Sequence, residues 1–564
     1  MTRLLHRCRR LLPFIAIAVV AVWTVLPVLR FAETSLPVRS NLLTTVPVFN
    51  AWTIWWNADR ILHGFSGYWD APIFFPADHA FAFSEPQPAT LIVAPVVWLT
   101  GSPASAYNVY LLLSLFLNGV VSLGVLRRHG VSRGLATIGG VMMVWLPVSL
   151  RQLEVLQLIP VWPLLWVWDV LARHGRAPSW RTGIEFAIAF SISFYTCVHQ
   201  TLLLSIVLFA TVWILLAALR SIRFWSMSLV AVASVAIPVA VVLVPMRQSL
   251  SDNNFERSEK TVTRLSARAS DLILLPSDAP LRGANGNRFG LSPGWLKIIL
   301  AGCGVVWGVR RRKRRRWVWY LAATVLVSSL LAMGPNLRVG EFQPWWTIAE
   351  WCPGLRQVRS VFRFVYLAQI AIVLLSVIGL SELWLQLRIR TGRSMLASSV
   401  IAAIGILAIA EVPAPRPLVA GVPNLNRHAG WTGFVKENTP RGKSIACLPF
   451  SPGRRAADFS VTSRWMYMGT LHGVPLVNGY SGFFPRAYMN LRTQITDNGL
   501  TDENLSQLAQ MKVHFLVVQP EYAMPQSATE TRKSHELRLV FEDPVGIDVY
   551  ELINVDRDSS SLLN

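Results

Sequence analysis

Short arginine-rich turns alternate with long polar stretches between the apolar segments of this chain. Each apolar segment has roughly the 20 residues that an α-helix needs to cross a bilayer. Since short loops rich in Lys and Arg stay on the cytoplasmic side of a membrane, these turns predict one orientation, with the N-terminus in the cytoplasm and the long polar stretches outside. The basic segments that agree on this orientation are residues 3–10, 127–128, 173–176, 220–223, 310–316 and 388–393.

The composition supports a membrane protein. Hydrophobic residues make up 53% of the 564 residues and charged residues only 15%, which is more apolar surface than one water-soluble domain can bury. The formal charge of +22 could indicate a nucleic-acid partner. Because the arginines lie in turns between helices rather than on one face, we expect membrane lipid with anionic headgroups as their partner and no nucleic acid.

Eleven apolar segments predict a mainly α-helical, multi-pass bundle in the cytoplasmic (inner) membrane. We expect the first to be a retained span rather than a cleaved secretory signal, because it is long for a signal and has no clear small-x-small cleavage site. An odd number of crossings carries a cytoplasmic N-terminus to a C-terminal region outside. The expected spans are residues 11–31, 105–126, 133–149, 158–172, 182–197, 199–218, 225–245, 293–309, 317–333, 362–383 and 394–411.

Two domains are expected, a membrane domain at residues 1–411 and an extracytoplasmic α/β domain at residues 412–564. The membrane domain includes a large first outer loop, residues 32–104. Its tryptophan-rich stretch, residues 50–62, suits a helix that lies along the membrane interface. Residues 89–99 are apolar but too short to cross and are flanked by Pro and Gly, which favours a shallow or re-entrant helix.

The C-terminal domain begins after a proline-rich linker and has the patterns of a small α/β fold. Residues 443–450 and 513–518 read as strands, residues 502–511 as a helix and residues 537–552 as a closing pair of strands. Cys352 and Cys447 are both expected outside and are expected to be free thiols, since no CxxC or Cys/His cluster indicates a metal site. The chain also has no GxxxxGK[ST], HExxH or GxSxG motif, which argues against an ATP-driven pump, a zinc protease or a serine hydrolase.

Carboxylates of the first outer loop are the leading candidates for chemistry, namely Asp59, Asp70 and Glu85, together with His63 and His79. Transfer of a sugar from a polyprenyl phosphate needs a base for the acceptor hydroxyl, and cations or a metal for the departing phosphate. A solvent-exposed loop also carries acidic residues that have no catalytic role. The sequence pattern alone therefore leaves open whether these carboxylates are catalytic or simply exposed to solvent.

Arg359 and Arg363 are four residues apart at the outer end of a predicted span. On a helix they would share a face and present two forked donors to an anion such as a lipid phosphate. The alternative is that both reach the headgroups without binding a substrate. Similarly, Arg151 and Glu154 could form a simple interfacial pair or a functional site.

Several stretches of this sequence resemble, in order and spacing, bacterial multi-span proteins of the C-type (GT-C) glycosyltransferase superfamily. They are Asn50–Gly64, Tyr68–Pro76, Phe83–Glu85, Ala106–Asn108, Leu156–Gln157, Arg257–Ser258, Leu265–Ala267, Pro353–Gly354, Arg359, Arg363–Phe364 and Asn478–Pro485. The resemblance implies a helical membrane enzyme of the cell envelope. It also implies a polyprenyl-phosphate-linked sugar donor, an active site at the outer face and an acid in the first outer loop.

The chain departs from the family pattern at polar positions. Similar proteins tend to have an acid before a proline where this chain has Val46-Pro47, and Ser-Glu-His where it has Ser84-Glu85-Pro86. A histidine that commonly precedes Leu-Gln is replaced by Val155, and an expected acid by Asn287 or Arg288.

Two functions follow from these observations. In the first, the chain is an active glycosyltransferase in which Glu85 and Asp70 act as base or as ligands of a divalent metal. Arg359, Arg363, Gln157 and Trp55 then bind substrate. In the second, it is a catalytically silent relative that binds a lipid-linked sugar or a partner protein, because loss of catalytic groups costs orders of magnitude in rate. A transporter would need discontinuous helices or acids deep in spans, and few are present.

Overall fold

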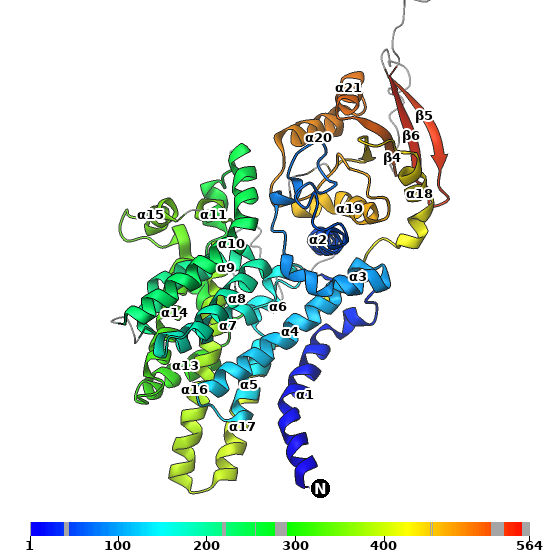
Figure 1. The fold of residues 1–564 in the computed structure, drawn as a ribbon. Helices are drawn as coiled ribbons and strands as arrows, with labels where there is room; N and C mark the ends of the chain where they lie inside the picture. The colour runs from blue at the N-terminus through cyan, green and yellow to red at the C-terminus, as the bar shows by residue number, and fades with distance from the viewer. Residues whose placement is uncertain are drawn as a thin grey trace, which may run out of the picture. The chain divides into compact units, whose positions relative to one another are not determined.

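The computed structural model describes residues 2–38, 44–216, 221–253, 255–276, 290–352, 354–451, 453, 455–519 and 535–554. It divides into two compact units (Figure 1). The helical unit comprises Met1–Arg30, Val109–Val241 and Glu256–Pro417. The α/β unit comprises Phe31–Asn108, Val242–Phe255 and Leu418–Asn564, so the first outer loop and the C-terminal region belong to one compact unit.

Each expected span overlaps one α-helix, or in one case two, within the described residues. The helices are α1 (Thr2–Leu29), α4 (Pro103–Arg128), α5 (Arg133–Val144) with α6 (Pro147–Leu150), α7 (Trp162–Arg176), α8 (Trp180–Thr196), α9 (Val198–Thr211), α10 (Ile222–Asp252), α13 (Trp295–Gly308), α14 (Arg315–Met333), α16 (Val365–Thr391) and α17 (Ser394–Ala410). Within the described residues, six helical segments are long and apolar enough to cross a membrane. Crossing by all eleven remains a prediction.

Short helices complete the helical unit. They are α11 (Glu259–Arg264), α12 (Ala269–Ile273) and α15 (Pro344–Trp351), with the 3₁₀ helices η3 (Leu156–Leu158), η4 (Val212–Ile214), η6 (Gly334–Asn336), η7 (Leu355–Gln357) and η8 (Val361–Phe364).

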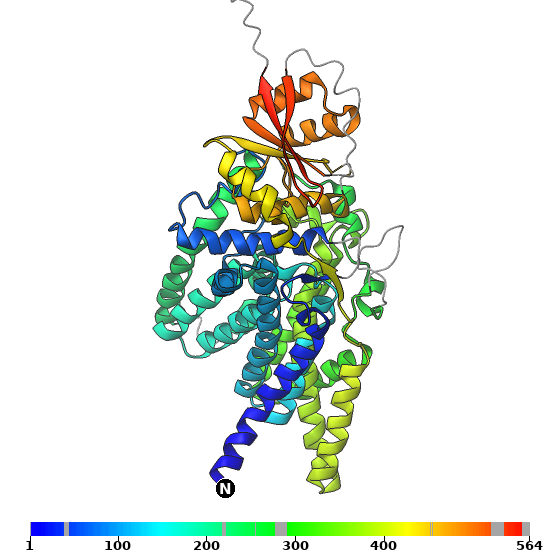
Figure 2. The same cartoon turned by 90° about the vertical axis from the view of Figure 1, so that its right-hand side faces the viewer.

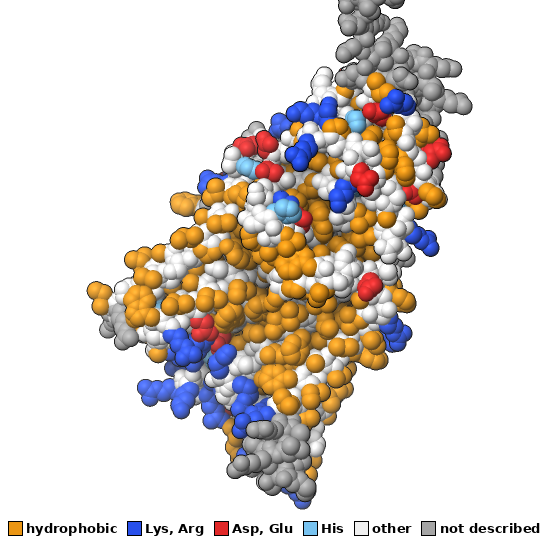
Figure 3. All heavy atoms as spheres, turned by 45° about the vertical axis from the view of Figure 1, so that its right-hand side comes forward, with side chains coloured by type: hydrophobic (Ala, Val, Ile, Leu, Met, Phe, Trp, Pro, Cys, Tyr) orange, Lys and Arg blue, Asp and Glu red, His pale blue; other side chains and the backbone are white. Residues whose placement is uncertain are grey.

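The outer surface of the helical unit is apolar. On α10, Leu229 is 71% and Ile237 73% exposed, and hydrophobic side chains cover much of the face in Figure 3. A surface of this kind is stable only when lipid or another protein covers it. The α10 helix therefore has the character of a lipid-facing span.

Helix α16 is the centre of the helical unit. It is apolar all round, as expected of a helix that is covered on every side, and it packs against α5, α13, α14 and α17. Its hairpin with α17 is visible in Figure 2. The closest crossing is with α13, where a Cβ on Gly304 would overlap the carbonyl oxygen of Leu375, and a Cβ on Gly379 would overlap that of Leu300. Small residues let helix backbones approach in this way in membrane proteins.

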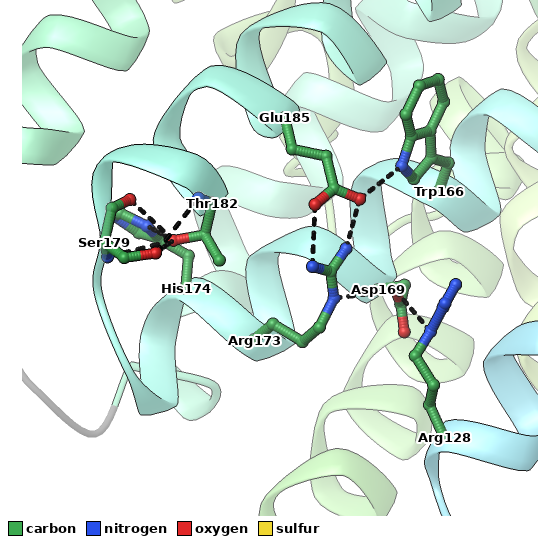
Figure 4. A network of polar contacts seen from close by, with 8 residues as sticks. All are labelled: Arg128, Trp166, Asp169, Arg173, His174, Ser179, Thr182 and Glu185. Carbon is green, nitrogen blue, oxygen red and sulfur yellow. Dashed lines mark hydrogen bonds and ion pairs between the residues drawn. The ribbon is translucent and has the colours of Figure 1, made fainter.

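An ion-pair network ties together the ends of α4, α7 and α8 (Figure 4). Asp169, whose side chain is 1% exposed, pairs with Arg128 at 3.2 Å and with Arg173 at 3.0 Å. Arg173 also forms a forked pair with Glu185, which accepts a hydrogen bond of 3.0 Å from Trp166. Two arginines of the basic turns thus hold helices together, in addition to any role in orientation.

The α/β unit contains a four-stranded sheet in the order β3 (Ser444–Leu448), β4 (Val513–Val518), β6 (Asp548–Asn554), β5 (His535–Glu542). The β3–β4 pair is parallel and the other pairs are antiparallel. The strands expected at 443–450 and 513–518, the closing strand pair and the helix at 502–511 are all present. A second, two-stranded sheet pairs β1 (Ser35–Val38) of the first loop with β2 (Leu418–Gly421), which follows the linker.

Helices surround the larger sheet and extend the unit. They are α2 (Thr45–Leu62), α3 (Ala94–Thr100), α18 (Ala429–Asn438), α19 (Ser460–His472), α20 (Arg486–Asn498) and α21 (Asp502–Gln510), with the 3₁₀ helices η1 (Ala80–Phe83), η2 (Pro88–Val93), η9 (Leu425–His428) and η10 (Ala456–Phe459). The α2 helix packs against α19.

The tryptophans of α2 differ from the interfacial prediction. Trp52 and Trp56 are 1% and 4% exposed and belong to the hydrophobic core of the α/β unit. The helix was expected from its periodicity, but sequence cannot tell whether an aromatic face meets lipid or protein. The aromatic loop after α19 is part of the same core: Phe483 stacks on Phe255 and Phe484 on Phe459. The aromatic side chains of this loop are therefore packed within the core of the unit.

Candidate functional site

The α/β unit contains a cavity of about 610 Å³ whose walls are aromatic and acidic. We call it the aromatic–acidic cavity. Its walls come from the C-terminal half of α2, the loop at residues 70–78, α18 and the end of α19. The side chains that give it chemical character are Trp55, Trp56, Asp59, Arg60, His63, Asp70, Asp78, Lys436 and His472.

The α2 helix supplies one wall through its regular spacing. Trp55, Asp59 and His63 are four residues apart and therefore share one face. Trp56 is fixed from both sides: its indole N–H donates to the carbonyl oxygen of Tyr68 at 2.9 Å, and the Arg60 guanidinium lies 4.3 Å over its ring. The wall is thus held rigid by packing and by a cation–π contact.

The carboxylates of the cavity differ in how far they are neutralised. Asp59 is paired with Arg60 and lies 3.5 Å from His63. Asp70 is exposed, and its Oδ1 accepts a hydrogen bond of 3.0 Å from the backbone N–H of His79. Among the described residues no ion pair involves Asp70, so this carboxylate is oriented by the loop but keeps its charge available for a ligand.

His472 is a buried, neutral donor in the cavity wall. Its Nδ1 accepts a hydrogen bond of 2.9 Å from the N–H of Val474, so in the neutral ring the proton is on Nε2. Nε2 is buried and has no hydrogen-bond partner among the described residues. Burial, with a smaller contribution from the charge of Lys436, lowers the pKa of His472 to about 3.

This pKa predicts acid sensitivity of the α/β unit. An unfolded histidine has a pKa of about 6.5, so below that pH the unfolded chain binds a proton that the folded chain does not. The contribution of neutral His472 to stability is therefore fully present above pH 6.5 and is lost as the pH drops toward 3. Within this range the unfolding equilibrium constant should rise about tenfold for each pH unit. Chemical denaturation at pH 7, 6 and 5 measures this. The His472→Asn variant, which keeps an acceptor for Val474, should show a flatter profile; an equally steep one would assign the effect to other groups.

Asn57 holds the segment around Glu85 against α2. Its amide donates to the carbonyl oxygens of Pro86 and Gln87 at 2.8 and 3.2 Å, and its Oδ1 accepts from the Tyr68 hydroxyl at 2.8 Å. Asn57 is 0% exposed, so these bonds are made in a dry environment.

An Asn57→Leu variant is expected to lose about 2 kcal/mol of stability, because the buried Pro86 carbonyl oxygen and the Tyr68 hydroxyl would each lose their hydrogen bond to Asn57. Limited proteolysis should show faster cleavage within residues 80–90, and thermal melting should show a lower Tm. The conservative variant Asn57→Asp retains an acceptor for Tyr68 but no donor, so it should be nearly as unstable. A normal Tm for Asn57→Leu would show that the segment is held by other contacts.

The expected site residues fall into both units. Trp55 and Asp70 line the aromatic–acidic cavity, whereas Glu85 is half-buried in the Asn57-bound segment and is not a lining residue. Gln157 lies in η3 of the helical unit, and Arg359 and Arg363 precede α16. The expectation that the two arginines share a helical face is wrong, because Arg359 is not helical and α16 begins only at Val365.

The arginines nevertheless gather with other polar residues of the helical unit. Both lie close enough to His199, at the start of α9, to interact with it electrostatically. The Gln200 side chain of the same helix donates to the carbonyl oxygen of Leu158 in η3 at 3.1 Å. Arg359, Arg363 and His199 therefore form a polar cluster in the helical unit, and Gln157 lies in the η3 segment that Gln200 of α9 contacts.

Asp78, Lys436 and His472 of the cavity were not identified from sequence. Lys436 and His472 lie more than 350 residues after α2 in the chain, and neither is part of a local motif. Within the described residues no group of three or more His, Cys, Asp or Glu side chains could hold a metal ion, so we assign no step to a metal. Cys352 and Cys447 are free thiols, as expected. Asn287, Arg288, Arg220 and Pro353 lie outside the described residues.

Comparison with known proteins identifies the fold. No family model matches the chain, and no curated protein matches it significantly. Among solved structures, a cryo-EM structure of arabinofuranosyltransferase AftD from mycobacteria matches with a TM-score of 0.57 at 15% identity. The chain resembles a glycosyltransferase in fold. A mutant form of the same enzyme matches with a TM-score of 0.52 at 16% identity.

The match extends over 95% of this chain but only 39% of the first AftD structure and 41% of the second. The chain therefore spans about two-fifths of the length of these AftD chains. With the six apolar helical segments of the described residues, this similarity in fold supports a multi-pass membrane protein.

Proposed function

We propose that this chain is a membrane glycosyltransferase that takes a sugar from a polyprenyl-phosphate-linked donor at the outer face of the cytoplasmic membrane. The aromatic–acidic cavity carries the proposal. Indole rings pack against the apolar faces of sugars, and carboxylates accept hydrogen bonds from their hydroxyl groups. Trp55 and Asp70 line one cavity and can supply these two contacts, within a chain whose fold is similar to part of an arabinofuranosyltransferase.

In this mechanism Asp70 is the base. Its carboxylate takes the proton of the acceptor hydroxyl, the hydroxyl oxygen attacks the anomeric carbon of the donor sugar, and the polyprenyl phosphate departs with the bonding electron pair. Asp70 fits this role because it is oriented by the His79 N–H and exposed to a ligand. Glu85 is the second candidate for the base, in the segment that Asn57 holds.

The helical unit holds a separate candidate, the polar cluster, as a site for a phosphate anion. We expect Arg359 and Arg363 to bind the phosphate of a lipid-linked sugar, and Gln157 to donate a hydrogen bond to one of its oxygens.

The test is to incubate the purified full chain with radiolabelled polyprenyl-phosphate sugars and follow transfer to added acceptor glycans and release of polyprenyl phosphate. Transfer with at least one donor is expected. Neither transfer nor binding with any donor would overturn the proposal.

One observation favours a second function, a catalytically silent relative that binds lipid-linked sugar. The first turn of α2 has Val46-Pro47 where similar proteins tend to have an acid before the proline. Saturable binding of the lipid-linked sugar without turnover would identify this second function.

A further inference from the structure

A second cleft, in the helical unit, has no role in the chemistry above. It measures about 370 Å³ and lies between the turn that joins α13 to α14 and the second half of α16. Four consecutive cations line it, Arg311, Arg312, Lys313 and Arg314, with Glu382 as its single acid and Trp384 on its wall. We call it the basic cleft.

Glu382 organises the basic cleft without neutralising it. Its side chain is 6% exposed, and it pairs with Arg311 at 3.1 Å and with Arg314 at 3.3 Å. Arg314 is also anchored to the carbonyl oxygen of Gly130. These contacts fix two of the cations, because a buried carboxylate and its partners hold one geometry.

The other two cations of the basic cleft have no internal partner. Arg312 and Lys313 are exposed, and among the described residues neither takes part in an ion pair or a side-chain hydrogen bond. Four cations against one carboxylate leave a strong positive charge in a small concave site. The ligand that fits is an anion about the size of a phosphate headgroup.

Exposed apolar side chains lie next to the basic cleft, alongside further cations of the α16–α17 hairpin. Trp384 lies on the wall, where its indole N–H donates to Ser398 of α17 at 3.1 Å and Arg388 lies 5.3 Å over its ring. Further along the α16–α17 hairpin, Ile389 and Met395 are 68% and 85% exposed. A free phosphate would make no contact with these apolar side chains, whereas the acyl chains of a phospholipid would pack against them.

We propose that the basic cleft binds the headgroup of an anionic phospholipid, with its phosphate on Arg312 and Lys313 and its glycerol and first acyl carbons against Trp384. The site is independent of sugar transfer. Basic pockets at the membrane ends of helices recognise anionic lipid in this way, and each cation near the surface contributes several-fold to affinity.

The test uses the full chain, purified in detergent and titrated with dioleoyl phosphatidylglycerol or tetraoleoyl cardiolipin, with bound lipid counted by native mass spectrometry. One tightly retained anionic lipid is expected, and dioleoyl phosphatidylcholine should not replace it. The double variant Arg312→Gln/Lys313→Gln should bind that lipid about 30-fold more weakly.

A matched double variant is Arg390→Gln/Arg393→Gln, which removes two exposed cations near the same hairpin but outside the basic cleft. It should retain the lipid as the unaltered chain does. An equal loss of lipid affinity in both double variants would show that general surface charge, rather than the basic cleft, binds the lipid, and would overturn the proposal. Displacement of the lipid by equimolar glycerol 3-phosphate would also overturn it, because the ligand would then be a soluble phosphate.

Discussion

An Asp70→Asn variant is expected to transfer sugar at least about 100-fold more slowly than the unaltered chain, because a positioned general base contributes that much or more to a transfer rate. The substitution keeps the side-chain oxygen that accepts from the His79 N–H, so the loop should keep its conformation. The measurement is the initial rate with a saturating radiolabelled donor, together with donor affinity. The rate should fall while affinity changes little.

Asp497→Asn is the matched control for this prediction. Asp497 is an exposed carboxylate of α20 in the same unit and is not part of the cavity, so its loss should leave the rate unchanged. A normal rate for Asp70→Asn combined with a large loss for Glu85→Gln would move the base to Glu85. Normal rates in both variants would remove the acid of the first outer loop from the mechanism.

A Gly304→Leu variant is expected to destabilise the helical unit by about 3 kcal/mol or more, because a side chain there meets backbone rather than a flexible side chain. A Cβ on Gly304 would overlap the carbonyl oxygen of Leu375, so α13 and α16 would have to separate along their closest crossing. Thermal melting of the detergent-solubilised chain should show a much lower Tm and the yield of folded protein should drop.

Gly302 offers a control on the same helix. It is exposed, and a Cβ there would meet nothing within 4 Å, so Gly302→Leu adds the same hydrophobic volume without a clash. Its Tm should stay close to that of the unaltered chain. An equal Tm for Gly304→Leu and Gly302→Leu would mean that the α13–α16 crossing can relax at little cost in free energy.

Local patterns in the sequence predicted the apolar helices and the strands of the larger sheet, but not β1, β2 or the helices α18, α19 and α20. Each apolar segment is a helix, and the strands at 444–448 and 513–518 lie where alternating or β-branched residues predicted them. The reason is that the periodicity of a helix or a strand depends only on residues that are close together in the sequence. The start of α16 was predicted too early, at residue 362, because the 3₁₀ turn Val361–Phe364 has the same apolar character as the helix that follows.

The candidate site was predicted only in part. Asp70 and Trp55, two of the expected site residues, line one cavity, and their roles toward a substrate stay a prediction. Lys436 and His472 could not be chosen, because nothing in their local sequence marks them. The role of α2 was also misjudged, since an aromatic helix face looks the same whether lipid or protein covers it.

The sequence by itself determined a basic, multi-helix chain with apolar helices at definite positions and a small C-terminal α/β region, because hydrophobic length and periodicity are local properties. Only the tertiary structure decided that residues 31–108 and 418–554 fold as one compact unit. Only the tertiary structure places Asp70 in one cavity with Lys436 and His472. Only the tertiary structure shows that α13 and α16 cross closely at Gly304 and Gly379. Contacts between distant residues depend on how helices and strands pack, and packing is a property of the whole folded chain rather than of any segment.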